Sequence, residues 1–440
     1  MLRRRIQLGL VHVAITMTLV PINSTLNRVM IKELAISATL VALMASLPYL
    51  ISPIQVYIGS HSDRIRFFGL RRTPYIFLGL ILCVAGVSFS PFVAFVLAEN
   101  FWLGILVGVL AFGAWGMGYN LAAVSYLSLA SEISGKDGRS RTIAVMWFMM
   151  IVSIILTSIT LSRMVDPYTP EVLKTSFQWI GGAAFLLGII GLLWLENREH
   201  QVEADADEDA QAEERYSWLH MARGVIDNPQ ARRFFWYLIL LLVAILGQDI
   251  LLEPFAGEAF EMSVTETTRI TSIWGVFVLV ALLITGWLET RLDKRSLAAW
   301  GGWAVLAGFV MIALSGILLQ ASVFYAGLVF LGIGTGVSTV SNLSLMLDMT
   351  VEGQVGLFIG AWGMANAISR LIGSILGGAV RDVVRQITGD SVLGYIMVFT
   401  IMAFMVFVTL IMLRQIDVNA FRKRAEDFPV VERAALAGDA

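Results

Sequence analysis

The stretch NREHQVEADADEDAQAEERYSWL, residues 197–219, interrupts an otherwise apolar chain and divides it into two parts. Its acidic side chains include Glu203, Asp205, Asp207, Glu208, Asp209, Glu213 and Glu214. Such a segment buries too little apolar surface to order itself. We predict a solvated cytoplasmic linker over residues 197–233, and a docking site for a basic partner is the alternative interpretation.

The composition of the whole chain is that of a membrane protein. Hydrophobic residues make up 57% and charged residues 15%, and the mean hydropathy is +0.77. A soluble globular protein is about 25% charged. The 31 basic and 33 acidic residues nearly cancel, so no net field attracts nucleic acid. The single cysteine, Cys83, excludes a disulfide framework and a cysteine-based zinc site.

Apolar runs on both sides of the linker are long enough to span a bilayer, which takes about 20 residues of helix. Twelve such runs lie near residues 6–28, 36–58, 74–97, 101–127, 143–164, 176–196, 234–253, 267–288, 297–319, 322–346, 357–380 and 392–414. We therefore predict an all-α polytopic membrane protein with twelve transmembrane helices. The predicted parts are an N-terminal six-helix half at 1–196, the linker at 197–233, a C-terminal six-helix half at 234–414 and a cytoplasmic tail at 415–440.

Basic residues predict the orientation of the chain. If Arg3, Arg4 and Arg5 are cytoplasmic, the loops on the same side hold 23 of the 31 Lys and Arg residues. Cytoplasmic loops of membrane proteins carry such an excess. Both termini are therefore predicted to be cytoplasmic.

The two halves share identical residues when they are aligned at an offset of 218 residues. Gly116, Gly118, Leu127, Gly135 and Gly138 align with Gly334, Gly336, Leu345, Gly353 and Gly356. These positions fall in the fourth and tenth runs and in the loops that follow them. Six-helix halves related in this way place a cavity at their interface in many transporters.

The loop after the second run carries a recognisable pattern. Gly59-Ser-His-Ser-Asp63-Arg64, followed by Gly69-Leu-Arg71-Arg72, resembles the cytoplasmic signature loop of the major facilitator superfamily. The resemblance implies a major facilitator fold of two pseudo-symmetric halves. It also implies that the aspartate and the arginines latch the inner ends of helices, through helix ends and neighbouring carboxylates.

A narrower resemblance spans both halves, from about residue 20 to about residue 410. Its elements are Asn27-Arg28-Val29-Met30, Leu70-Arg71-Arg72-Thr73-Pro74-Tyr75, Gln248-Asp249-Ile250-Leu251-Leu252-Glu253-Pro254 and Gly360-Ala361-Trp362-Gly363. They resemble the bacteriochlorophyll delivery (PucC-type) family of phototrophic bacteria. The resemblance implies a role in handling (bacterio)chlorophyll while light-harvesting complexes assemble. It further implies contact with antenna or reaction-centre subunits, in a bacterial inner membrane or a photosynthetic (intracytoplasmic or thylakoid) membrane.

Polar residues cluster near the predicted outer ends of the first and seventh runs. Asp249 and Glu253 are four residues apart, as are Asn23 and Asn27, so each pair shares one helix face. We predict an outer polar cluster with Arg28 as the counter-ion of Asp249 or Glu253. Two interpretations stay open, a gate or ligand-contacting site and a salt bridge that only locks the halves together. A secondary transporter of a small solute, proton-coupled through Asp249 or Glu253, is the alternative function.

Two further polar residues lie inside predicted spans, where a polar or charged side chain is unfavourable unless it has a partner. Arg370 lies near mid-membrane, where an arginine faces the bundle interior and seeks a partner. Asp348 and Asp249 are its acidic candidates. His12 is the only histidine in a predicted span, and imidazole can bind the magnesium of a chlorophyll. His12 is therefore the candidate ligand for a pigment that we expect to bind transiently.

Enzyme motifs do not occur in the sequence. It has no phosphate-binding loop ending in Gly-Lys-Ser/Thr, no Gly-x-Ser-x-Gly elbow and no His-Glu-x-x-His helix. We expect no enzymatic activity, no catalytic residues, no metal ligands and no tightly bound cofactor.

Overall fold

The computed structural model describes residues 2–54, 58, 70–196, 229–349 and 355–416. Within these ranges the chain is all-α and forms no β-strand. The predicted linker at 197–233 and the predicted tail at 415–440 lie largely outside the described residues.

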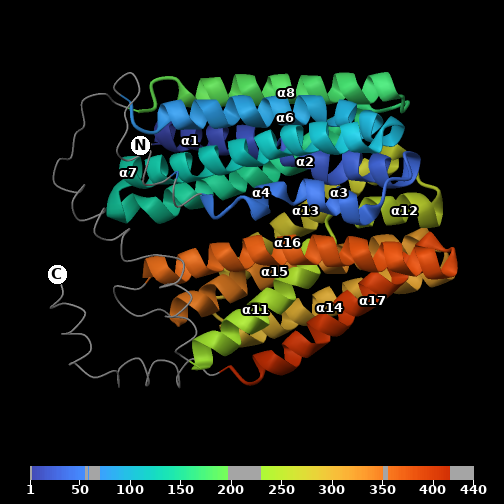
Figure 1. Cartoon of the computed structure of the whole chain (residues 1–440). Coiled ribbons are helices and arrows are strands. Elements are labelled where there is room, and N and C mark those ends of the chain that lie inside the picture. The colour runs from blue at the N-terminus through green and yellow to red at the C-terminus, as the bar shows by residue number, and fades with distance from the viewer. Residues whose placement is uncertain (1, 55–57, 59–69, 197–228, 350–354, 417–440) are drawn as a thin grey trace.

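The helices form two packed groups, drawn in blue to green and in yellow to red in Figure 1. The N-terminal bundle consists of α1 (Leu2–Thr16), α2 (Leu19–Pro21), η1 (Ile22–Leu26), η2 (Val29–Glu33), α3 (Ala38–Ala45), α4 (Leu47–Leu50), α6 (Thr73–Glu99), α7 (Phe101–Met164) and α8 (Pro170–Leu192). The C-terminal bundle consists of α11 (Pro229–Gly247), α12 (Leu252–Phe260), α13 (Val264–Leu288), α14 (Lys294–Leu318), α15 (Ala321–Asp348), α16 (Val355–Thr388) and α17 (Ser391–Leu413).

Ten helical segments of the described chain are long and apolar enough to cross a membrane, so this is a multi-pass membrane protein. The predicted runs 36–58 and 357–380 are not among these ten. The first of them is divided between α3 and α4 and continues outside the described residues. The second is helical throughout α16. The predicted total of twelve is therefore not fully confirmed.

Two predicted runs lie in α7, which consists of two helices, Phe101–Gly135 and a second part that ends at Met164. The backbone bends at Gly135, whose φ of 64° and ψ of 175° are not helical. Glycine adopts this positive φ without the steric penalty that a Cβ atom brings. The fourth and fifth predicted runs therefore meet at a kink instead of being separated by a longer loop.

The first and seventh predicted runs are interrupted helices. The first continues from α1 through two π-helical turns to Glu33, five residues beyond its predicted end. The seventh ends as α11 at Gly247 and restarts as α12 at Leu252. At the break, a Cβ on Gly247 would lie 2.7 Å from the carbonyl carbon of Gly373. The close approach of α11 and α16 therefore requires glycine at this position.

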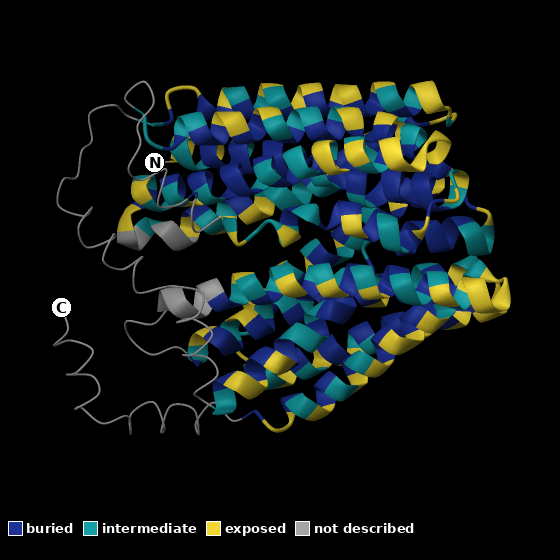
Figure 2. Cartoon of the chain, in the orientation of Figure 1, coloured by how far each residue is buried: buried dark blue, intermediate teal, exposed yellow. Residues whose placement is uncertain are grey.

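The two bundles meet along several helices. Helix α13 packs against α7, and α16 packs against α3 and α4. Buried residues concentrate in the middle of the assembly, whereas exposed residues recur along the outermost helices (Figure 2). Helix α1 begins, and α17 ends, on the same side of the assembly (Figure 1). Which face of the membrane this side adjoins remains a prediction.

Candidate functional site

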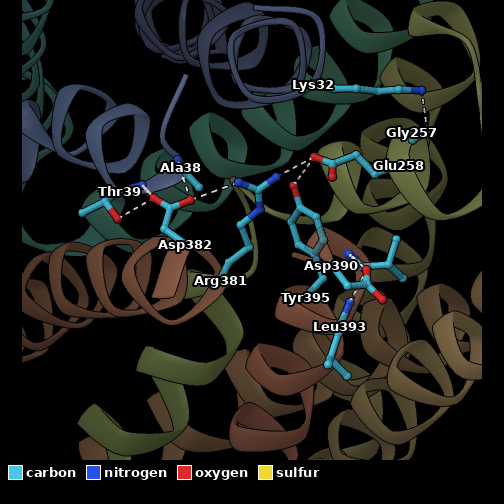
Figure 3. A network of polar contacts seen from close by, with 11 residues as sticks. Lys32, Ala38, Thr39, Gly257, Glu258, Arg381, Asp382, Asp390, Leu393 and Tyr395 are labelled. Carbon is cyan, nitrogen blue, oxygen red and sulfur yellow. Dashed lines mark hydrogen bonds and ion pairs between the residues drawn. The ribbon is translucent and has the colours of Figure 1, made fainter. Parts of the chain in front are cut away.

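The two bundles are joined by polar contacts at the end opposite the start of α1, which we call the outer end. Figure 3 shows the part of this network that centres on α16. We use the name outer junction for five residues, Arg28 and Lys32 from the N-terminal bundle and Glu258, Arg381 and Asp382 from the C-terminal bundle.

The N-terminal bundle supplies cations to the end of α12. The Arg28 guanidinium donates to the carbonyl oxygen of Met262 at 3.0 Å, and the Lys32 ammonium donates to that of Gly257. Gly257 is among the last four residues of α12, whose carbonyl groups have no partner within the helix. These carbonyls also form the negative end of the helix dipole. Lys32 therefore caps the C-terminal end of α12, and Arg28 binds the backbone just beyond that end.

The C-terminal bundle in turn supplies an anion to the start of α3. The Asp382 carboxylate accepts from the backbone N–H groups of Ala38 at 3.2 Å and Thr39 at 2.8 Å. It also accepts from the hydroxyls of Ser37 at 2.9 Å and Thr39 at 2.7 Å. Unpaired N–H groups at a helix start favour an anionic acceptor. Asp382 thus caps a helix of the other bundle (Figure 3).

Arg381 holds the acidic members of the outer junction in place. Its side chain is 1% exposed and forms ion pairs with Glu258 at 2.8 Å and Asp382 at 3.0 Å. Its guanidinium carbon lies 5.0 Å from the centre of the Tyr395 ring. The Tyr395 hydroxyl donates to Glu258 at 2.9 Å. A buried charge is tolerated only when it is paired and hydrogen-bonded in this way.

A second charged pair lies between α11 and α16. Arg370 donates to Asp249 at 2.6 Å, and the Gln248 amide donates to the same carboxylate at 2.8 Å. The guanidinium carbon of Arg370 lies 5.3 Å from the centre of the Tyr49 ring, which belongs to the N-terminal bundle. Asp249 is thus the partner of Arg370. The other acidic candidate, Asp348, pairs with Lys294 at 2.8 Å.

The predicted outer cluster does not form as one unit, and the expected ion pair of Arg28 with Asp249 or Glu253 is wrong. Arg28 forms its ion pair with Glu33. The reason is the π-helical backbone, in which i→i+5 bonds bring residues five apart onto one face. Arg28 remains close enough to Glu253 to interact through its charge.

The remaining members of that cluster bond to their own surroundings. Glu253 is buried and accepts from the Thr271 hydroxyl at 2.7 Å. The Asn27 amide donates to the backbone carbonyl oxygen of Asn23 at 3.1 Å, and the shared face of the two asparagine side chains stays a prediction.

The predicted signature loop is only partly within the described residues, since Gly59, Asp63 and Arg64 lie outside them. Arg72 pairs with Glu132 at 2.9 Å, which joins α6 to α7. The backbone N–H groups of Arg71 and Thr73 donate to Glu196 at 2.7 and 2.8 Å. Glu132 and Glu196 were not predicted as functional residues. The sequence feature that could have indicated them is that each places a carboxylate near the end of an apolar run.

His12 is buried and stacks against Tyr126, with ring centres 5.1 Å apart and the ring planes inclined by 29°. Its Nδ1 atom has no hydrogen-bond partner among the described residues. Nothing in this packing tests the expectation that His12 binds a pigment. In the described part of the chain, no three His, Cys, Asp or Glu side chains are grouped as metal ligands.

Solved structures of transporters share this arrangement of helices. A bacterial homolog of the human lysosomal transporter Spinster, inward-facing and unoccupied, superposes with a TM-score of 0.71 at 10% identity, over 96% of this chain and 98% of that chain. The D-xylose-proton symporter superposes with a TM-score of 0.65 at 13% identity, over 91% of this chain and 96% of that chain. At such low identity the likeness establishes the fold alone, which is the predicted major facilitator fold.

Sequence relatives extend over nearly the whole chain. Protein PucC of Rhodovulum sulfidophilum is 31% identical over 394 residues, which are 87% of this chain and 86% of the relative. The bacteriochlorophyll synthase 44.5 kDa chain of Rhodobacter capsulatus is 29% identical over 88% of this chain and 89% of the relative. The sequence model of the PUCC protein family matches residues 25–421, which include the C-terminal bundle and the N-terminal bundle from Thr25 onward. The chain therefore belongs to the PUCC protein family.

Proposed function

We propose that this protein is a membrane factor that delivers or chaperones (bacterio)chlorophyll, without catalysis, during assembly of light-harvesting antenna complexes. The observation that carries the proposal is the PUCC family match through both bundles. A relative of similar length bears the name bacteriochlorophyll synthase 44.5 kDa chain, which links this family to the pigment. The partners would be antenna or reaction-centre subunits in a photosynthetic membrane.

The geometry of the outer junction supports a role that involves movement. The contacts of Arg28, Lys32 and Asp382 are hydrogen bonds to backbone groups at helix ends. Each contributes about 0.5–3 kcal/mol, because water can replace it when the bundles separate. A ligand that binds one arrangement of the bundles more tightly would shift such an equilibrium.

The second candidate function is secondary transport of a small solute. Its specific support is the ion pair of Arg370 and Asp249, which touches Tyr49 of the other bundle and leaves both charged side chains partly exposed. A charged pair within a membrane is characteristic of ion and substrate pathways. The transporter fold fits this function equally well.

The experiment that separates the two functions is purification in mild detergent from a phototrophic host. A red absorption band that stays with the protein through size exclusion, together with co-purifying antenna polypeptides, supports pigment delivery. A colourless protein without antenna partners contradicts it.

Asp249→Asn supplies a second readout in the same host. Unchanged antenna and pigment levels in the variant, together with lost proton-coupled solute uptake, would establish the transport function instead.

A further inference from the structure

A groove runs along the membrane face of the N-terminal bundle, between α1, the second part of α7, and α8. Its volume is about 660 Å³, within the range of small-molecule sites. Val13, Met17 and Ile180 form its apolar floor and are buried, whereas Leu156 and Trp179 at its edges are exposed. The groove is therefore open toward the lipid, and its floor belongs to the protein core.

Two buried hydroxyl groups in this apolar groove have no hydrogen-bond partner among the described residues. Ser153 and Thr157 are four residues apart on α7, line the groove, and are only 7% and 6% exposed. Neither side chain has a hydrogen bond to any part of the chain that the structure describes. By contrast, Ser158 donates to the carbonyl oxygen of Thr268 at 2.6 Å, and Ser162 donates to that of Ile159 at 3.0 Å.

This contrast between neighbouring residues of α7 indicates which ligand chemistry the groove accepts. Serine and threonine in a helix normally bond to a carbonyl of the preceding turn. Ser153 and Thr157 instead direct donors into a space from which water is excluded by lipid and apolar side chains. A ligand with oxygen acceptors in an otherwise apolar body would satisfy them.

The length of the groove matches an extended hydrocarbon chain. Phe148 and Met164 both line it and are sixteen residues apart on α7, which is about 24 Å along a helix. Met17, Met149 and Met164 are unbranched and polarizable, so their side chains adapt to an irregular branched chain. Trp179 at the edge is 68% exposed and offers an aromatic face to a flat ring system.

The geometry points to this groove as the binding site for the long-chain ester of a chlorophyll-type tetrapyrrole. The isoprenoid tail lies along the groove, and the hydroxyls of Ser153 and Thr157 donate to carbonyl oxygens of the ester and ring substituents. The inference rests on the proposed function and adds the position of the pigment. His12 does not line the groove, so the binding assigned here depends on the tail and not on ligation of magnesium.

The test compares two adjacent positions on α8 in the full-length protein. Ala183 lines the groove, whereas a side chain at Gly182 would meet open space. The protein is purified, incubated with bacteriochlorophyll or with its tail-free acid, and passed through size exclusion. Retained pigment is measured by absorption, retained phospholipid by mass spectrometry, and folding by thermal unfolding.

We expect wild type to retain the tailed pigment and not the tail-free acid. Ala183→Trp should lower retention of the tailed pigment about tenfold by filling the groove, whereas Gly182→Trp should leave it unchanged. The double variant Ser153→Ala with Thr157→Val keeps the apolar shape, and its retention should fall about five- to hundredfold because two hydrogen bonds are lost.

Three outcomes would overturn the inference in different ways. Pigment retained equally by wild type, Ala183→Trp and the double variant would place the pigment elsewhere and leave the proposed function standing. Loss of phospholipid instead of pigment in the variants would make the groove a lipid site. Wild type that retains no pigment in any form would contradict both the groove assignment and the proposed function.

Discussion

The helices that follow the first and the seventh predicted runs begin in different ways. Helix α13 caps itself, since Ser263 accepts from the Glu266 N–H at 3.2 Å and Glu266 accepts from the Ser263 N–H at 2.8 Å. Helix α3 has its own cap only in part, because Ser37 accepts from the Leu40 N–H. Its first N–H groups donate to Asp382, which is more than 340 residues away in the other bundle.

This difference indicates which of the two helix starts depends on the other bundle at the outer end. If the bundles separate there, α13 keeps both bonds of its capping box, whereas α3 loses the acceptor for its first N–H groups. The C-terminal end of α12 loses Arg28 and Lys32 in the same motion. A helix cap is worth about 0.5–2 kcal/mol and a cation at a helix end about 0.3–1 kcal/mol. The polar contacts at the outer end therefore contribute a few kcal/mol to closure, which ligand binding can offset.

The largest loss of stability at the outer end should come from Arg381→Met. Arg381 is buried and holds both Glu258 and Asp382, so its loss leaves two carboxylates without their cation. Breaking a buried ion pair from one side costs about 3–5 kcal/mol. Thermal unfolding of the purified protein should show a clear drop in midpoint. Arg385→Met, four residues further along α16 on an exposed position, is the matched control. Equal midpoints for the two variants would contradict the central role of Arg381.

A smaller and more specific effect is expected from Asp382→Ala. The variant removes the cap of α3, so the outer end should open more often, by about tenfold for a loss of about 1.4 kcal/mol. Electron spin resonance between labels at Thr175 and Gln320, at the outer ends of the two bundles, should show a longer distance. The labels require Cys83→Ala as the background, because Cys83 is the only native cysteine.

The control for this prediction is the self-capped helix. Glu266→Gln weakens the capping box of α13 and should leave the distance distribution unchanged. Asp382→Asn should restore part of the closed population, because an amide oxygen also accepts at a helix start. A distance shift in Glu266→Gln as large as in Asp382→Ala would remove the distinction between the two helix starts.

The sequence was sufficient for the features that depend on local composition. Apolar runs predicted the all-α membrane fold, and the high cost of a charge in lipid predicted an acidic partner for Arg370. Asp249 was one of the two candidates, and the structure selects it. Choosing between Asp249 and Asp348 needed the packing of α11 against α16, which periodicity does not contain.

The outer junction was beyond sequence reasoning for two physical reasons. The pairing of Arg28 with Glu33 depends on π-helical turns, whereas the helical period predicts partners three or four residues apart. The capping of α3 by Asp382 joins distant parts of the chain, and Ser37 in the sequence signals only a local cap. Asp382 also follows the predicted end of its membrane span at residue 380, so its charge required no buried partner.

The smallest effect is expected from Lys32→Met, which tests the reverse direction of the capping. Lys32 donates to a carbonyl at the C-terminal end of α12 from the other bundle, and the methionine keeps most of the side-chain volume. A lost cation at a helix end costs about 0.3–1 kcal/mol, so the labels at Thr175 and Gln320 should report a small rise in the open population. Lys174→Met, on an exposed ion pair within α8, should cause no rise. If Lys32→Met raised the open population as much as Asp382→Ala, the cation at the end of α12 and the anion at the start of α3 would contribute equally to closure. The dependence of α3 on the other bundle would then no longer be the larger of the two effects.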